Sequence, residues 1–239
     1  MRNIRLTIEY DGTDFCGWQY QPNQRTVQGE IENALRKITD ENIKIIGAGR
    51  TDQGVHALAQ VANFKTNSRL TLNQFQKGIN ALIGDDVYIK EIDEVDEQFH
   101  ARFSAHSKIY RYSIMLKPSP LFRRYNWYVP FALDIELIKK TIPQIIGEHD
   151  FTHFSVHNGD KKGICIMTDL SLILSDYQIT ITLEANRFLR KMVRGIVGFL
   201  IDLARGKFSP DDTSRVFSGE IKDLYFAPPH GLCLIKVNY

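Results

Sequence analysis

An arginine and a carboxylate stand two residues apart in the glycine-punctuated stretch from Gly47 to Ala57. The segments on either side, residues 43–46 and 58–64, are rich in β-branched and apolar residues and predict strands. We therefore expect Asp52 at the end of a strand, in a tight loop beside Arg50, where a carboxylate can act on a ligand. Glycine, threonine and aspartate are also ordinary turn residues, so the local pattern alone allows either a functional site or a plain turn.

Two stretches of the chain are basic and contain no acidic residue. Between Gln98 and Leu133 the basic residues alternate with aromatic ones, and they are Arg102, Lys108, Arg111, Lys117, Arg123 and Arg124. The second stretch contains Arg187, Arg190, Lys191 and Arg194. Lysine and arginine bind phosphate groups, and aromatic rings stack on bases. The pattern favours a polyanion with stackable bases, although charge runs are also common on solvated faces.

Metal and cofactor chemistry are not indicated. His149, His153 and His157 are spaced by four, but the residues between them favour a strand or irregular segment over a helix, and no carboxylate pattern completes a metal motif. We expect no metal site. The three cysteines are scattered and predict free thiols. The chain contains neither a phosphate-binding loop nor a dinucleotide fingerprint, so no cofactor is expected.

The composition predicts a globular protein. With 239 residues and 43% hydrophobic content, the chain can bury a core in one large or two small domains. The first ten residues alternate polar and apolar residues without an apolar signal region, and the longest helical apolar run, residues 196–201, is too short to span a bilayer. We expect a soluble, cytoplasmic protein. The net charge of +2 says little about partners.

The periodicity of apolar residues predicts the same order of elements twice. The first half reads as a strand at 3–10, a helix at 26–39, the two strands around Asp52, a helix at 71–83 and a strand at 87–95. After residue 105 the order recurs as a strand at 108–115, a helix at 134–146, strands near 166–174 and 178–184, a helix at 187–205 and a closing strand at 232–238. Pro143 makes the last turn of the helix at 134 doubtful, and Gly206 is placed to end the long basic helix.

This order is the split β-α-β-β-α-β pattern. We therefore predict an α+β protein of two ferredoxin-like halves, residues 1–105 and 106–239, with mainly antiparallel sheets. The first half carries the Asp52 loop and the second carries the helix with Arg194. The halves are expected to meet around a central basic cleft.

With these residues identified, nearly the whole chain resembles the tRNA pseudouridine synthase A family, which isomerises uridines in the anticodon stem-loop of tRNA. The matching motifs, in chain order, are the opening segment Glu9–Gln19, the core Gly49–His56, Phe99–Ala105, Tyr110–Tyr112 and Met192–Arg194. Several ordered motifs are far more specific than any one of them.

The resemblance implies three catalytic residues. Asp52 corresponds to the essential aspartate, Tyr110 to the tyrosine that packs on the target base and helps to move its C5 proton, and Arg194 to the partner of Asp52. Arg50 would face the RNA and admit the flipped nucleotide. Further RNA contacts are expected from His56, Arg102, Lys108, Arg111, Arg187, Arg190 and Lys191.

The family also implies a homodimer with tRNA lying across both subunits, modification at positions 38 to 40 of the tRNA, and neither metal nor organic cofactor. One departure from the family pattern is Lys161–Lys162, where we expect an arginine before the following strand.

The residue types fit this chemistry. A carboxylate is ionised at neutral pH and can act as a nucleophile without a base, and a guanidinium in contact keeps it ionised when a bound base excludes water. Uridine offers C6 and the ribose C1′ as electrophiles, and the sequence does not choose between them. A noncatalytic RNA-binding protein is the alternative, and an RNA hydrolase is a third hypothesis.

Overall fold

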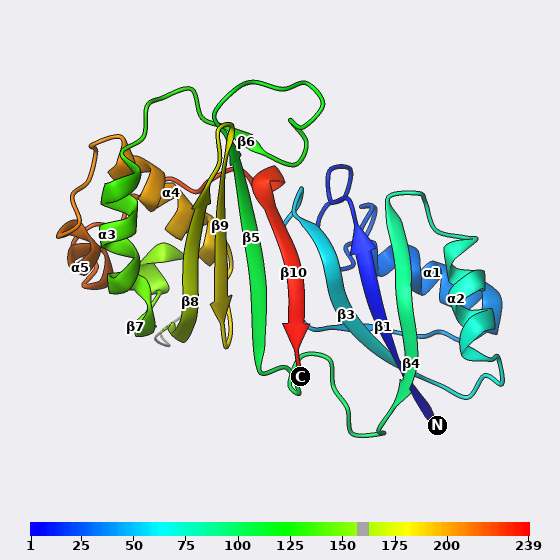
Figure 1. Ribbon diagram of the computed structural model, residues 1–239. Helices are drawn as coiled ribbons and strands as arrows, with labels where there is room; N and C mark the ends of the chain where they lie inside the picture. Colours follow the sequence, from blue (N-terminus) through cyan, green and yellow to red (C-terminus); the bar gives the residue numbers. More distant parts are fainter. Residues whose placement is uncertain (157–162) are drawn as a thin grey trace. The chain divides into compact units, whose positions relative to one another are not determined.

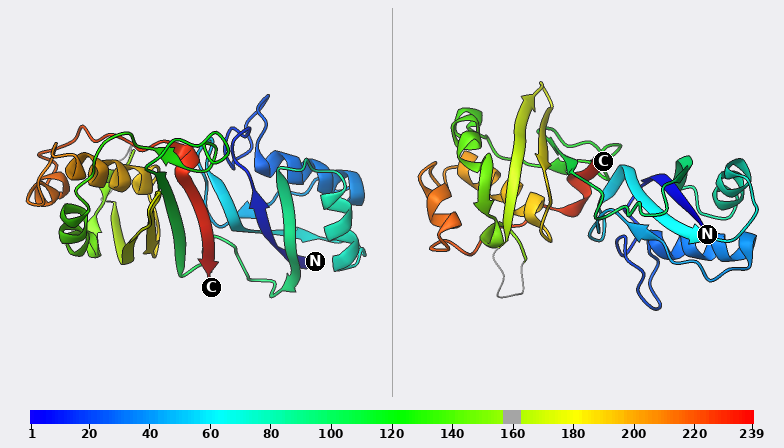
Figure 2. Two further views of the ribbon diagram at one scale, coloured as in Figure 1. Left: turned by 45° about the horizontal axis from the view of Figure 1, so that its top comes forward. Right: turned by 90° about the horizontal axis from the view of Figure 1, so that it is seen from below.

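The computed structural model describes residues 1–156 and 163–239, and the chain folds as two compact units (Figure 1). The first unit comprises Met1–His106 together with Cys233–Tyr239, and the second comprises Ser107–Leu232. Each unit is a sheet with its own helices (Figure 2). The expected α+β class with mainly antiparallel strands is confirmed.

The first unit has the predicted β-α-β-β-α-β order. Its elements are β1 (Arg2–Tyr10), α1 (Val27–Thr39), β2 (Ile46–Gly47), β3 (His56–Thr66), α2 (Leu72–Asn80) and β4 (Val87–Val95). The strands lie in the order β4-β1-β3-β2, and all neighbours are antiparallel. This is the strand order of a ferredoxin-like half. The last strand of the chain, β10 (Leu232–Asn238), pairs in parallel with the first residues of β3.

The alternation in β1 explains why this sheet has one buried face. Ile4, Leu6 and Ile8 are fully buried, because successive side chains of a strand point to opposite faces. The other face is polar: Arg5 on β1 forms an ion pair with Asp93 of β4 at 2.9 Å. One face therefore builds the core, and the other is held by cross-strand charge pairs.

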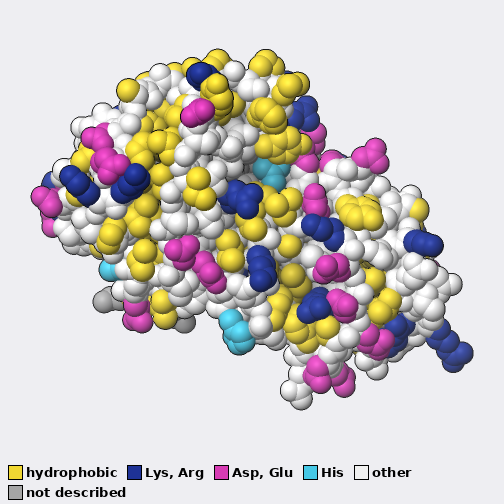
Figure 3. Space-filling model, in the orientation of Figure 1, with side chains coloured by type: hydrophobic (Ala, Val, Ile, Leu, Met, Phe, Trp, Pro, Cys, Tyr) yellow, Lys and Arg dark blue, Asp and Glu magenta, His cyan; other side chains and the backbone are white. Residues whose placement is uncertain are grey.

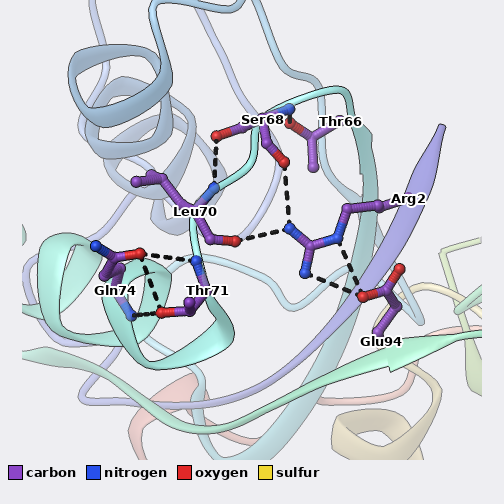
Figure 4. Close-up of polar contacts among 7 residues, drawn as sticks. All are labelled: Arg2, Thr66, Ser68, Leu70, Thr71, Gln74 and Glu94. Atoms are coloured by element: carbon purple, nitrogen blue, oxygen red, sulfur yellow. Dashed lines mark hydrogen bonds and ion pairs between the residues drawn. The ribbon is translucent and has the colours of Figure 1, made fainter.

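The start of α2 is fixed by local polar contacts (Figure 4). Thr71 caps the helix: its hydroxyl accepts a hydrogen bond from the Gln74 N–H, and the Gln74 side chain accepts one from the Thr71 N–H. Beside it, the Arg2 guanidinium donates to the carbonyls of Ser68 and Leu70 and pairs with Glu94. The capping box satisfies backbone donors that have no partner inside the helix.

The second unit repeats much of this order with additions. Its elements are β5 (Ser107–Met115), β6 (Trp127–Tyr128), α3 (Ile135–Ile145), β7 (Gly147–Asp150), the 3-10 helix η1 (Thr152–Phe154), β8 (Ile164–Leu174), β9 (Gln178–Ala185), α4 (Met192–Ala204), α5 (Asp212–Phe217) and the 3-10 helix η2 (Pro229–Gly231). The sheet order is β5-β9-β8-β7 with antiparallel neighbours, and β6 adds in parallel to the end of β5. The short β7 and α5 were not predicted.

The predicted start of the basic helix is wrong by five residues. We expected a helix from 187, but α4 begins at Met192, because Lys191 has a φ of 61° in the left-handed region. The predicted end is confirmed. Gly206 has a φ of 82°, and its N–H and that of Lys207 bond to the carbonyls of Leu203 and Asp202 at 2.9 Å each. This arrangement is a Schellman motif.

Two further expectations differ from the structure. The strand expected at 43–46 is reduced to Ile46–Gly47, because Ile43 and Ile45 are buried outside the ladder. The last turn of α3 forms in spite of Pro143: the proline removes one hydrogen bond, but the Ile146 N–H still bonds to the Ile142 carbonyl at 3.3 Å. None of the helices in the described residues is long and apolar enough to cross a membrane.

Candidate active site

The Asp52 loop, residues 48–55, connects β2 to β3 in the first unit. Its base is fixed by two bonds to β3: the Ala48 N–H donates to the Val61 carbonyl at 2.7 Å, and the Gln60 side chain donates to the Gly49 carbonyl at 2.9 Å. Asp52 itself is partly buried, between the buried Thr51 and the exposed Gln53. A partly buried carboxylate in an anchored loop is placed to act on a ligand.

Thr51 is held through both of its polar oxygen atoms. Its hydroxyl shares a hydrogen bond with the Tyr10 hydroxyl at 2.8 Å, and its carbonyl accepts one from the Trp18 N–H at 3.1 Å. Burial raises the pKa of the Tyr10 hydroxyl well above its ordinary value, so this group stays protonated. The residue directly before Asp52 is therefore locked to the end of β1 and to the segment that follows β1.

Two glycines let that segment approach the loop. A Cβ at Gly12 would lie 2.0 Å from the Val55 carbonyl oxygen, and one at Gly17 would lie 2.7 Å from the Thr51 oxygen. Gly17 also has a φ of 89°, which side chains other than glycine rarely adopt. Both glycines belong to the opening segment, Glu9–Gln19. At these two glycines its contact with the Asp52 loop is backbone against backbone.

His56 lies inside the first unit. The residue is 5% exposed, and its Nδ1 accepts a hydrogen bond from the Gly12 N–H at 3.0 Å. Asp11 Oδ1 lies 3.0 Å from the same nitrogen. His56, which was expected to contact RNA, therefore connects the start of β3 to the opening segment.

In the second unit, one face of β5 carries Lys108, Tyr110 and Tyr112. These three residues alternate along the strand and are 9%, 7% and 0% exposed. The Tyr110 ring lies edge-on against Phe188, with centroids 5.0 Å apart. Arg111 is exposed and, by the same alternation, points to the opposite face of the strand.

Arg194 lies in the first turn of α4, beside that face of β5. Its Nε donates to the Ala227 carbonyl at 2.7 Å, and the Ala227 N–H donates back to the Arg194 carbonyl at 3.0 Å. The next carbonyl, that of Pro228, accepts the Tyr112 hydroxyl at 2.7 Å. Burial raises the pKa of Tyr112, and the positive charge of Arg194 opposes this shift. The Ala227–Pro228 segment therefore brings Arg194 next to the strand face that carries Tyr110.

The remaining basic positions lie on loops. Arg187, Arg190 and Lys191 precede α4 and do not form one helical face, which corrects the expected arrangement. Arg187 and Arg190 are exposed, and the Lys191 Nζ lies 5.7 Å from the centre of the Phe226 ring. In the first unit Arg50 is exposed, and Arg102 is exposed beside the ring of Phe103.

The three expected catalytic residues divide between the units. Asp52 belongs to the first unit, and Tyr110 and Arg194 belong to the second, so contact between Asp52 and Arg194 stays a prediction. His157 of the histidine series and the departing pair Lys161–Lys162 lie outside the described residues. Within residues 1–156 and 163–239, no three histidine, cysteine, aspartate or glutamate side chains form a group that could hold a metal ion.

Sequence analysis placed Tyr10, Asp11, Gly12, Gly17 and Trp18 in a matching motif but assigned them no contact with the Asp52 loop. A signal was present, because the opening segment combines aspartate and two glycines with aromatic residues at the end of a predicted strand. That composition indicates a tight, specific turn. It does not identify what the turn contacts.

Comparison with known proteins matches the parts of the chain that carry the Asp52 loop and Arg194. The family model described as "tRNA pseudouridine synthase" matches residues 6–104 and 142–239. Proteins named "tRNA pseudouridine synthase A" from Thermoanaerobacter sp. (strain X514) and "tRNA pseudouridine synthase A 2" from Clostridium perfringens (strain 13 / Type A) are 42% and 43% identical to the chain, with 100% of both sequences covered. One from Bacillus cereus (strain ATCC 14579), named "tRNA pseudouridine synthase A 1", is 41% identical over 100% of this chain and 99% of its own length.

Among solved structures, one titled "Crystal Structure of a Cbf5-Nop10-Gar1 Complex" aligns with 96% of this chain and 57% of that chain. The identity is 11% and the TM-score is 0.37, a likeness too small to bear on function.

Proposed function

The chain belongs to the tRNA pseudouridine synthase family and is an RNA pseudouridine synthase, and we propose that it acts on uridines at positions 38 to 40 in the anticodon stem-loop of tRNA. The observation that carries this proposal is the locked position of Thr51, which fixes the backbone of Asp52 at the surface of the first unit. An RNA-binding protein without catalysis has no use for a fixed carboxylate facing a ligand rich in phosphate.

Asp52 is the nucleophile of the proposed reaction. Its carboxylate attacks C6 of the uracil or C1′ of the ribose, and the bond between N1 and C1′ breaks. The base then turns, a bond forms between C5 and C1′, and the bond between Asp52 and C6 or C1′ breaks, which regenerates the carboxylate. The C5 proton leaves and N1 gains a proton. No electron donor or acceptor is needed, since the product is an isomer of the substrate.

Tyr110 packs on the base and helps to move the C5 proton. Paired uridines must leave the helix to be modified, which costs a few kcal/mol. Stacking on an aromatic ring and contacts to phosphates offset this cost. Because A-form RNA hides its base edges in a deep groove, we propose recognition by shape and backbone. The protein's contacts to the RNA would come from Arg50, Arg102, Arg111, Arg187, Arg190 and Lys191, with His56 and Lys108 acting from more buried positions.

Arg194 is proposed to keep Asp52 ionised and oriented when the base closes over it. The two residues belong to residues 1–105 and 106–239, so each half supplies one member of the pair. We further propose that the enzyme is a homodimer with tRNA lying across both subunits, and that it works in the cytoplasm, where its substrate is.

Replacement of Arg194 separates its two proposed roles. Arg194→Met should lower kcat by at least about a hundredfold, because a group that stabilises reacting charge typically contributes that much, while the Kd for tRNA changes by less than about threefold. Single-turnover kinetics and filter binding measure the two quantities. Arg187→Met is the matched control, and it should weaken binding more than turnover. Equal losses of both quantities in Arg194→Met would assign Arg194 to phosphate binding.

The function itself is tested by mapping pseudouridine in treated tRNA. Carbodiimide labelling followed by primer extension should give stops at positions 38 to 40 after incubation with the enzyme. Shortened RNA on a denaturing gel would indicate hydrolysis instead. Unmodified tRNA that is nevertheless bound would favour the noncatalytic alternative.

A further inference from the structure

A long segment of the second unit lies outside both parts of the chain that match the family model. Residues 117–131, which we call the aromatic arm, follow β5 and precede α3 (Figure 1). The family model matches 6–104 and 142–239. Large apolar side chains at the tip of the arm are exposed: Leu121 is 82% exposed and Phe122 is 60% exposed.

The base of the arm is firmly attached. Trp127 and Tyr128 form β6 against the end of β5, and the Val129 N–H donates to the Met115 carbonyl at 3.1 Å. Asn126 is buried, donates to the Phe122 carbonyl at 3.2 Å and accepts a hydrogen bond from Gln178 at 2.9 Å. The tip is therefore presented in a preformed conformation, which lowers the entropy lost on binding.

The charge of the arm is entirely positive. No acidic residue occurs between Gln98 and Leu133, and the arm contains Lys117, Arg123 and Arg124. In the space-filling view, hydrophobic side chains cover much of the upper end of the molecule, with basic and a few acidic side chains among them (Figure 3). Arginine beside exposed aromatic rings suits phosphates and bases together. A symmetric contact between two copies of this surface would bring like charges together.

We propose that the aromatic arm binds unpaired nucleotides of the RNA substrate, with Phe122 stacking on a base and Arg123 contacting a phosphate. This inference rests on the proposed function. Met115, at the base of the arm, is five residues beyond Tyr110 on the same strand, so it lies about 17 Å away along β5. The arm therefore holds RNA that flanks the reacting uridine and contributes to binding more than to the chemical step.

The test uses the full-length protein and an unmodified tRNA transcript. Phe122→Ala should raise the Kd and KM for tRNA roughly tenfold, since one base loses its stacking partner, with kcat within twofold of the wild type. Arg123→Gln should lower the slope of log K against log salt by about 0.7 to 0.9. The control variants, Tyr88→Ala and Lys37→Gln, remove an exposed tyrosine of β4 and an exposed lysine of α1 in the first unit. They should leave both quantities unchanged.

Several outcomes overturn the proposal. Unchanged Kd and salt slope in the arm variants would do so, provided that circular dichroism melting shows them folded. A shift from dimer to monomer in sedimentation, with tRNA affinity per subunit intact, would assign the arm to contact between copies. If the wild type binds tRNA but forms no pseudouridine, the proposed function fails and the arm is judged by the binding data alone.

Discussion

At the scale of single residues, the position of the Asp52 backbone depends on its neighbour Thr51. The Thr51 hydroxyl pairs with Tyr10, 41 residues away in the sequence, and its carbonyl accepts the Trp18 N–H. The spacing of Arg50 and Asp52 identified the loop, because a charged pair among glycines is a local signal. The partner residues could not be predicted, because nothing local to either segment specifies that β1 ends beside the loop.

The coupling free energy between the Tyr10 and Thr51 side chains can be measured with single and double variants. Tyr10→Phe leaves the buried Thr51 hydroxyl without that partner, so the free energy of unfolding should fall by about 1 to 3 kcal/mol, and kcat should fall more than KM changes. Thr51→Val removes the other side of the bond. Urea titration of both variants and of the double variant gives the coupling. The double variant should lose less than the sum of the single losses, and strictly additive losses would show that the hydrogen bond does not position the loop.

At the scale of elements, α4 begins later than predicted because the apolar pattern of the helix extends into the loop before it. The apolar spacing continues from Phe188 into the helix, so the sequence favours a start at 187. The left-handed φ of Lys191 interrupts the helix and sends the basic residues before it into a loop. Met192–Ala204 is buried on nearly every side, as expected of a helix that is hydrophobic all round. The end of the helix at Gly206 was predicted, whereas this interruption carries no local signal.

The glycines of α4 are required by close packing. In an exposed helix, replacing glycine by alanine stabilises by about 1 kcal/mol. A Cβ at Gly198 would lie 1.7 Å from the Tyr225 carbonyl oxygen, so Gly198→Ala should instead lower the free energy of unfolding by roughly 1 to 3 kcal/mol. In the control, Gly78→Ala of α2, the nearest atoms belong to the Ile38 side chain at 3.2 Å and not to backbone, and the change should be within about 1 kcal/mol. Equal stability of the two variants in urea titration would contradict this packing.

At the scale of the whole molecule, the chain returns to its first unit at the end. β10 pairs with β3, and the Tyr239 hydroxyl donates to the Ala101 carbonyl at 2.7 Å. Periodicity predicted the strand at 232–238, but the pattern of one strand cannot specify which sheet it joins. Because the proposed catalytic residues belong to both units, we expect activity to require that both units are folded.

Removal of the closing strand should therefore affect the first unit. A chain ending at Leu232 loses the pairing with His56 and Ala57, directly beyond the Asp52 loop. We expect faster amide exchange in β3 and β1 and a loss of activity, measured by hydrogen–deuterium exchange with mass spectrometry. Tyr239→Phe is the mild control, with one hydrogen bond lost and little change in exchange. Protection in β3 equal to that of the full chain would show that the first unit does not need β10.

The proposed homodimer predicts a sedimenting species of two 27.5 kDa chains. Analytical ultracentrifugation at micromolar concentration should give this mass with and without tRNA, because the dimer is proposed to exist before the substrate binds. A single 27.5 kDa species that remains fully active would contradict the proposed assembly.

The most direct test of the central claim is tritium release from tRNA labelled at C5 of its uridines, with wild-type enzyme and Asp52→Asn. Asparagine keeps the size of the side chain and removes its nucleophilic charge. The wild type should release tritium from the anticodon stem-loop, and Asp52→Asn should bind the same tRNA within about threefold of the wild type while releasing none above background. Release by Asp52→Asn at the wild-type rate would contradict the assignment of Asp52 as the nucleophile.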